Sequence, residues 1–305
     1  MLFRSWGAAK PKVVLLAHLD TVWPIGSYSP IWEINGDVLR GPGTFDMKAG
    51  FIQALFALKN IEGDVALIAT TDEEVGSQTS RDLILDVSKG ATAVLVLEAS
   101  LDGKVKTGRK GTSMYKIKVH GRAAHAGLEP EKGVNASVEI AHQVLQLSKL
   151  EDPTHGTTVV PTLMHSGTST NTVPELAEID IDARSFLTSE LERVDKAIKS
   201  LKANHPEATL EITGGLNRPP LQPTSTFELY EIAKKVAQEI GLGELGAAEV
   251  GGASDGNFAA SAGARVLDGL GAVGGGAHAA TEWVSVKSIT ERSAFLDRKS
   301  TRLNS

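Results

Sequence analysis

The order of apolar segments constrains the fold of this chain more than any other feature. From residue 13 onward, short apolar runs rich in β-branched residues alternate with stretches of helical periodicity. The extended runs lie at residues 13–17, 65–70 and 93–97, and helical stretches at residues 51–59 and 80–85 separate them. Strands that alternate with helices in this way form a mostly parallel sheet covered by helices. The sequence therefore predicts an α/β domain.

A second pattern interrupts the first in the middle of the chain. Its order is βαββαβ, which is typical of a small ferredoxin-like α+β domain. The extended segments are residues 115–119, 158–164, 176–184 and 208–213, and the helical segments are residues 135–150 and 189–204. A proline-rich connector at residues 217–223 then leads back to a helical pattern at residues 226–240 and an apolar run at residues 264–267. The α+β domain is thus expected to be inserted into the α/β domain.

These patterns set the expected domain boundaries, and 305 residues are enough for two domains. Residues 1–108 and 217–296 would form the α/β domain, and residues 109–216 the inserted domain. Residues 297–305 continue no apolar periodicity, and we expect them to be a disordered tail.

Charge and hydropathy exclude several classes of protein. The net charge is −6 and the basic residues are scattered, so the chain lacks the basic surface that nucleic-acid binding requires. It contains no apolar run near the roughly 20 residues that span a bilayer, and its start lacks the apolar core of a signal peptide. We expect no membrane partner and, for the chain as given, a cytoplasmic location, with a periplasmic one open for a longer form.

Ligand-type side chains recur at the ends of the predicted strands. His18 and Asp20 follow the first run, Glu73 and Glu74 follow the second, and Glu98 is the first polar residue after the third. In open α/β sheets, ligands bind at the carboxyl ends of the strands. Each residue also has an ordinary explanation when taken alone, since a histidine after a strand is more often a capping or core residue and a run of acids is normally solvated.

Two further ligand-type residues lie in glycine-rich turns. Asp46 lies in the segment GPGTFDMKAG at residues 41–50, where it could also be a simple helix N-cap, and His278 ends the segment GGGAH. The chain has no cysteine, so a transition metal must be held by His, Asp and Glu. Two histidines and three carboxylates are the set that two zinc ions about 3.5 to 4 Å apart and bridged by one carboxylate need.

Taken together, these motifs resemble those of the M20 family of metallopeptidases. The resemblance rests on His18-Leu19-Asp20, the segment at residues 41–50, Glu73-Glu74-x-Gly76, Glu98, the segment GRAAHAG at residues 121–127, and His278. It extends over residues 13–296, and within the family it is greatest to glutamate carboxypeptidases of the carboxypeptidase G type. Members of the family usually carry several tens of residues before the His-x-Asp motif, whereas seventeen precede His18, so we expect the native start to be missing.

The resemblance implies two zinc ions per subunit, with Co²⁺ or Mn²⁺ as substitutes. His18 and Glu98 would bind one ion, His278 and Glu74 the other, and Asp46 would bridge them.

The resemblance also implies the remaining site residues. Asp20 would orient the imidazole of His18, and Glu73 would be the general base. The inserted domain would be a dimerisation and lid domain, whose His125 reaches the site of a partner subunit in a homodimer and stabilises the oxyanion. Arg184 would bind the substrate carboxylate. Asn171 and Ser254 would contact the substrate.

The implied activity is hydrolysis of the amide bond before a C-terminal amino acid, glutamate above all, in a small peptide or N-acyl amino acid. The alternative within the family is an N-acyl amino acid deacylase, such as an acetylornithine or succinyl-diaminopimelate deacylase. Outside it, residues 269–274 fit Gly-x-Gly-x-x-Gly, but more glycines follow and no acidic residue lies about 20 positions on in a second strand, so a dinucleotide site is disfavoured. A non-catalytic binding protein is disfavoured because metal binding alone does not require Glu73.

Overall fold

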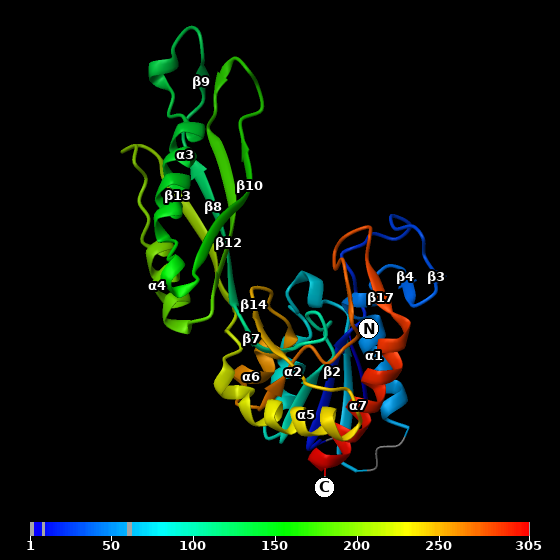
Figure 1. The fold of residues 1–305 in the computed structure, drawn as a ribbon. Coiled ribbons are helices and arrows are strands. Elements are labelled where there is room, and N and C mark those ends of the chain that lie inside the picture. The colour runs from blue at the N-terminus through cyan, green and yellow to red at the C-terminus, as the bar shows by residue number, and fades with distance from the viewer. Residues whose placement is uncertain (1–2, 8–9, 60–62, 305) are drawn as a thin grey trace. The chain divides into compact units, whose positions relative to one another are not determined.

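The computed structural model describes residues 3–7, 10–59 and 63–304, which form two compact units (Figure 1). Met1–Arg109 and Leu221–Ser305 make up the first unit, and Lys110–Pro220 the second. The expected boundary at residue 216 differs by four residues from this division. The reason is that the last strand of the second unit continues to Arg218, which pairs with Thr112.

The first unit is built on a five-stranded sheet of order β1-β5-β2-β6-β15. β1 (Phe3–Gly7) is antiparallel to β5 (Val65–Thr70), whereas β5, β2 (Val13–His18), β6 (Ala93–Val96) and β15 (Val266–Leu267) are parallel. Every residue of β2, β5 and β6 is buried. Strands buried on both faces read as continuous apolar runs, which explains why the sequence predicted them well. The predicted mostly parallel α/β sheet is confirmed.

Helices cover both faces of this sheet. Alternate residues of β2 point to opposite faces, so Leu15 packs with α1, α5 and α7, while Leu16 packs with α2 and α6. The helices on the first face are α1 (Ala49–Ala57), α5 (Phe227–Glu239) and α7 (Val286–Asn304), and those on the second are α2 (Arg81–Ser88) and α6 (Asp255–Ser261). Among the described residues, no helix is long and apolar enough to cross a membrane.

The expected disordered tail at residues 297–305 is wrong for the part that the structure describes. Helix α7 continues to Asn304, and Phe295, Leu296 and Leu303 pack on the core. Lys299 lies between them with its side chain buried. These buried positions at helical spacing were missed in the sequence because Lys299 counts as a polar residue there. Its aliphatic stem nevertheless covers apolar surface. Residue 305 lies outside the described residues.

Short strands complete the first unit. A four-stranded sheet has the order β16-β17-β4-β3, and β14 pairs in parallel with β7. Their bounds are β3 (Glu33–Asn35), β4 (Val38–Arg40), β7 (Val105–Arg109), β14 (Ala247–Val250), β16 (Gly274–Gly275) and β17 (Trp283–Ser285).

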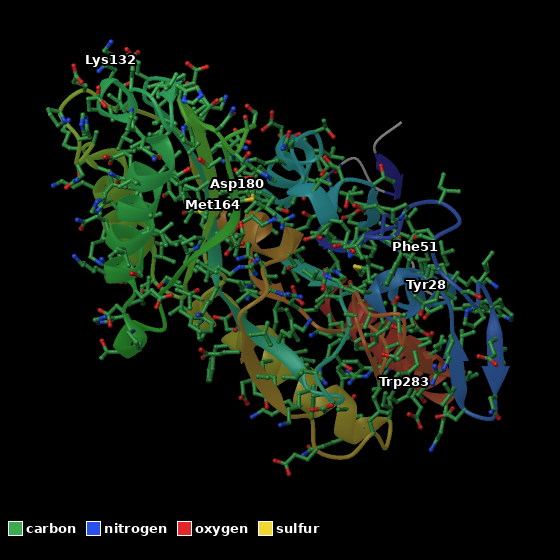
Figure 2. All side chains as sticks on the ribbon, turned by 90° about the horizontal axis from the view of Figure 1, so that it is seen from above. Tyr28, Phe51, Lys132, Met164, Asp180 and Trp283 are labelled. Atoms are coloured by element: carbon green, nitrogen blue, oxygen red, sulfur yellow. The ribbon has the colours of Figure 1, made fainter. Side chains whose placement is uncertain are left out.

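The second unit has the predicted βαββαβ order. Its four-stranded antiparallel sheet has the order β10-β12-β8-β13, and both helices pack on one face through a core that includes Ile117 and Ile179. The other face carries polar residues such as Asp180 (Figure 2). The elements are β8 (Gly111–His120), α3 (Ala136–Leu147), β10 (Thr158–Ser166), β12 (Leu176–Ser185), α4 (Thr188–Lys199) and β13 (Thr209–Arg218), with β9 (Ala124–His125) and β11 (Thr172–Val173) paired separately.

Candidate metal centre

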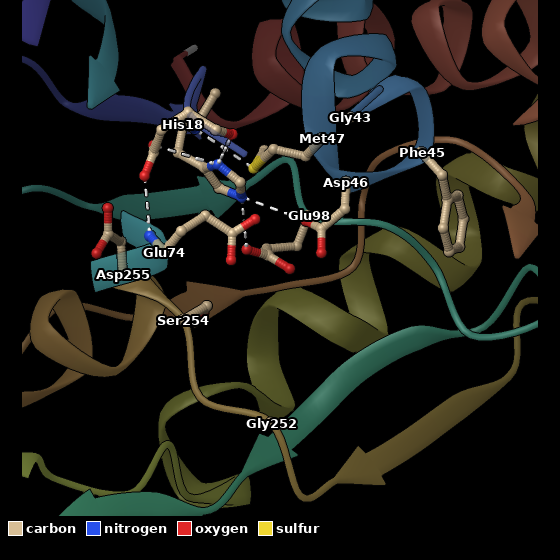
Figure 3. Close-up of polar contacts among 12 residues, drawn as sticks. His18, Gly43, Phe45, Asp46, Met47, Glu74, Glu98, Gly252, Ser254 and Asp255 are labelled. Carbon is tan, nitrogen blue, oxygen red and sulfur yellow. Dashed lines mark hydrogen bonds and ion pairs between the residues drawn. The ribbon is translucent and has the colours of Figure 1, made fainter. Parts of the chain in front are cut away.

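His18 lies at the carboxyl end of β2 and is buried. Its Nδ1 is 3.2 Å from the backbone carbonyl oxygen of Asp20 and 3.5 Å from the Asp20 carboxylate (Figure 3). A carbonyl oxygen can only accept, so Nδ1 carries a proton and donates it there. Nε2 then faces Asp46 and Glu98, whose oxygens lie 3.2 and 3.6 Å away. This is the arrangement of a metal-binding histidine held by an oxygen acceptor.

The carboxylate of Asp46 lies between two histidines. Its Oδ1 is 3.2 Å from Nε2 of His18, and its Oδ2 is 3.4 Å from Nε2 of His278, which in turn lies 3.1 Å from Oε2 of Glu74. Two groups of three potential ligands result, and Asp46 belongs to both. They are His18, Asp46 and Glu98, and Asp46, Glu74 and His278, and in each the ligand atoms lie within 4.8 Å of one another. Nitrogen and carboxylate oxygen donors with one shared carboxylate fit a pair of zinc ions.

Local backbone geometry brings these ligands close together. The turn that carries Asp46 leads into α1, and at Gly50 in the first turn of α1 an added Cβ would lie 2.0 Å from the carbonyl oxygen of Leu97, next to Glu98. Only glycine allows this approach of α1 to the end of β6. His278 has a φ of 61°, which is rare for a residue with a side chain. Such strain is typical of a functional site.

Glu73 and Glu74 lie in a short 3-10 turn, Glu73–Val75, after β5. Buried acids hold this segment at both ends. Asp72 accepts hydrogen bonds from the backbone N–H and hydroxyl of Thr79, at 2.8 and 2.6 Å. Asp255 accepts from Thr70, at 2.9 Å, and from Ser77.

A cavity of about 450 Å³ adjoins these residues. Glu73, Glu98 and His278 line it, together with Lys106 and Arg109 of β7. All of its lining residues belong to the first unit. The two basic residues were missed in the sequence because nothing local distinguishes them from surface lysines and arginines.

Arg109 is a buried cation that joins several parts of the centre. It donates two hydrogen bonds to Asp268, at 2.8 and 2.6 Å, one to Glu98 at 3.0 Å, and one to the carbonyl oxygen of Gly252 at 3.0 Å. Burial opposes ionisation of Glu98, but the charge of Arg109 and the contact with His18 lower the pKa of Glu98 to about 2. Glu98 is therefore ionised at neutral pH.

The other ligands also have shifted pKa values. Burial would raise the pKa of Asp46, but hydrogen bonds from His18 and His278 hold it well below its usual range. Burial and the charge of Asp46 raise the pKa of Glu74. Burial opposes protonation of His18, yet its acidic neighbours raise its pKa well above the usual value, and the hydrogen bond with Asp46 raises the pKa of His278 to about 9. These shifts favour positive charge among the carboxylates, which metal cations would supply.

Three predicted site residues, His125, Asn171 and Arg184, lie in the second unit. His125 is exposed, and its Nδ1 accepts hydrogen bonds from the backbone N–H groups of Gly127 and Leu128, both at 3.1 Å. Asn171 is close to His125, because the backbone carbonyl oxygen of Asn171 accepts a hydrogen bond from the backbone N–H of Ala126 at 2.9 Å.

Arg184 lies near the end of β12 and is about one-third exposed. Its guanidinium donates two hydrogen bonds to Asp182, at 2.7 and 2.9 Å.

Ser254 has a structural position. Its side chain is fully buried and caps α6, accepting from the N–H of Gly256 at 3.1 Å and donating to Asp268 at 2.7 Å. The neighbouring Gly252 and Ala253 line the cavity instead. A substrate in the cavity would therefore meet these two residues before the hydroxyl of Ser254.

Comparisons with known proteins agree with this fold. A family profile described as a peptidase dimerisation domain matches residues 107–210. Carboxypeptidase G2 of Pseudomonas sp. is 32% identical over 301 residues, which cover 94% of this chain and 72% of that protein. A succinyl-diaminopimelate desuccinylase of Methylococcus capsulatus is 26% identical over 96% of this chain and 83% of that protein. The crystal structure of an M20 family metallo-carboxypeptidase from Sulfolobus solfataricus superposes with a TM-score of 0.75 at 18% identity, over 99% of this chain and 87% of that one.

The fold and the centre define the chain as a hydrolase of the metallopeptidase class. It belongs to the M20 family of metallopeptidases.

Proposed function

We propose that this protein is a dinuclear zinc hydrolase that cleaves the amide bond before a C-terminal glutamate in a small peptide or N-acyl amino acid. The observation that carries the proposal is the position of Asp46, whose two oxygens face His18 and His278 separately. One carboxylate shared between two ligand groups is the requirement of a metal pair. Zinc held by these groups would polarise the scissile carbonyl and the attacking water.

In this proposal, Glu73 is the general base. It is buried and lines the same cavity as the ligands, while the adjacent Glu74 faces His278. Glu73 would take a proton from the attacking water and deliver it to the leaving amine. Asp20 would hold the imidazole of His18, and its Oδ2 also accepts from the N–H of Glu74 at 2.9 Å.

His125 would donate a hydrogen bond to the oxyanion in the site of a partner subunit. Its Nδ1 accepts from two backbone N–H groups, so the neutral imidazole carries its proton on Nε2. An exposed histidine held in this tautomer is suited to stabilise a developing negative charge. The match to a peptidase dimerisation domain supports a homodimer as the functional form.

Arg184 would bind the carboxylate of the substrate, with Asn171 as a further contact. Asp182 holds the guanidinium in one orientation, which reduces the entropy lost when a carboxylate binds. The likeness to a carboxypeptidase over most of both chains supports a C-terminal amino acid as the leaving group.

Two measurements test this function. Exhaustive removal of metal should abolish hydrolysis, and zinc should restore it with two ions per chain. In a panel of N-acyl amino acids that differ only in the C-terminal residue, glutamate should give the highest kcat/KM. Full activity without metal would refute the zinc mechanism. Rates that do not depend on the C-terminal residue would favour the deacylase alternative, which the desuccinylase relative supports.

A further inference from the structure

Glu282 is a buried acid that neither the ligand set nor the proposed catalysis uses. Its side chain is 1% exposed, and it lies four residues after His278, directly before β17. Its Oε1 accepts hydrogen bonds from the backbone N–H groups of Phe45, at 2.8 Å, and Asp46, at 3.0 Å. Its Oε2 accepts from the N–H of Gly43 at 2.9 Å. Three donors of the turn that carries Asp46 thus converge on one carboxylate.

We propose that Glu282 is a positioning residue, which sets the place of Asp46 and through it the affinity for both metal ions. The proposal rests on the proposed metal pair. Because Asp46 is the shared ligand, a displacement of its backbone would disturb both ligand groups at once.

The conformation of the Asp46 turn explains why it needs an external acceptor. Asp46 and Met47 have non-helical backbone angles inside the segment Thr44–Lys48, so regular helical hydrogen bonding does not continue through it. A buried N–H without an acceptor is costly, and an ionised carboxylate is a stronger acceptor than a carbonyl. The charge of Glu282 therefore stabilises this turn over alternative conformations that would move the Asp46 side chain.

Glu282 also connects Asp46 to the loop of His278. In the β16–β17 pair, Gly275 is opposite Trp283, and this pairing closes the loop that carries His278. At Gly276 in this loop an added Cβ would lie 3.0 Å from the backbone of Glu282. The hydroxyl of Tyr28 donates to the carbonyl oxygen of Glu282 at 3.4 Å, and both Tyr28 and Trp283 are labelled in Figure 2. One residue thus fixes the base of the His278 loop with its backbone and the Asp46 turn with its side chain.

The test is the substitution Glu282→Gln in the full chain. A glutamine side chain has the same shape but one acceptor oxygen and an N–H₂ group, so at least one N–H of the turn loses its acceptor. Zinc affinity should fall about 10- to 100-fold, as it does when groups that orient metal ligands are changed. Both ions should be affected. Competition with a chromophoric chelator gives the two affinities, and thermal melting of the metal-free protein gives the cost to the fold.

Glu139→Gln is the matched control. Glu139 is 2% exposed and accepts from the N–H groups of Asn204 and His205, both at 2.9 Å, and from Gln143 at 2.7 Å. It belongs to the second unit, whereas every proposed metal ligand belongs to the first. Its substitution should lower the melting temperature without changing zinc affinity.

Unchanged zinc affinity in Glu282→Gln would overturn the proposal, as would a loss no larger than that of the control. A loss confined to one ion would also contradict it, because the shared ligand serves both. If Glu282→Gln does not fold, Glu282→Asp, which keeps the charge and withdraws it by one methylene, is judged by the same criteria. A wild-type chain that binds fewer than two zinc ions would instead refute the metal pair, so the two failures are distinguishable.

Discussion

Glu73 and Glu74 are adjacent in the chain but have different surroundings. Glu74 contacts His278 at 3.1 Å and belongs to a ligand group, whereas Glu73 belongs to neither group. We predict that Glu73→Gln keeps its metal and loses about 100-fold or more in kcat, which is the scale of general-base catalysis. Glu74→Gln should instead lose metal on dialysis. Metal analysis beside steady-state kinetics checks both, and the reverse result would exchange the two roles.

Arg184 and Arg193 provide a matched pair in the second unit, since each guanidinium holds a neighbouring carboxylate with two hydrogen bonds. Arg184→Ala should impair substrates with a free C-terminal carboxylate more than the corresponding amides. The difference should be about 1.5 to 3 kcal/mol in transition-state binding, the range for a hydrogen bond to a charged group. Arg193→Ala should affect both substrates equally. Equal losses for Arg184→Ala would show that it does not bind the carboxylate.

Some residues of the centre could be predicted from the sequence and others could not. His18, Glu74 and Glu98 follow buried strands that meet at one edge of a sheet, so strand prediction alone brings them together. Arg109, Asp268 and Glu282 act through partners far away in sequence, such as the contact between Glu282 and Gly43. Their pairing depends on the tertiary fold, which no local pattern encodes. The roles assigned to the ligands stay predictions.

At the scale of elements, burial on both faces made β2, β5 and β6 predictable, whereas β3 and β16 are too short to show a period. Helix α7 illustrates a different difficulty. Its buried face includes Lys299, whose Nζ donates to the carbonyl oxygen of Leu229 at 3.3 Å. A buried lysine looks like solvated surface in the sequence, so residues 297–305 were expected to be a disordered tail.

Lys299 leads to a prediction about pH. Burial lowers the pKa of Lys299 well below the usual value, whereas its pKa in the unfolded chain is about 10.4. Between these two values the unfolded state binds more protons, so stability rises with pH. Lys299→Met should therefore melt at a higher temperature than the wild type near neutral pH, and the gap should shrink toward about pH 10. Lys287→Met, on the exposed side of the same helix, should change little, and a gap that is constant with pH would contradict the explanation.

At the scale of the whole molecule, the two-unit organisation could be predicted because each unit has its own periodicity and its own core. The composition of each active site could not be predicted, because the sequence of one chain does not determine which subunit of a dimer contributes His125. The proposed ligands and Glu73 lie in the first unit, and His125 lies in the second. A homodimer in which His125 serves the partner would have two composite sites, and complementation between two inactive variants can detect this.

The last prediction concerns mixtures of Glu73→Gln and His125→Ala proteins. Each homodimer should be inactive, because every site lacks either its base or its oxyanion donor. In a mixed dimer one site collects both substitutions and the other is wild type. Random reassociation of equal amounts makes half of the dimers mixed, so about a quarter of full activity should return. Mixing must follow dissociation, and native mass measurement verifies the mixed dimer. If the verified mixed dimer is as inactive as its parents, His125 acts within its own chain or has no catalytic role.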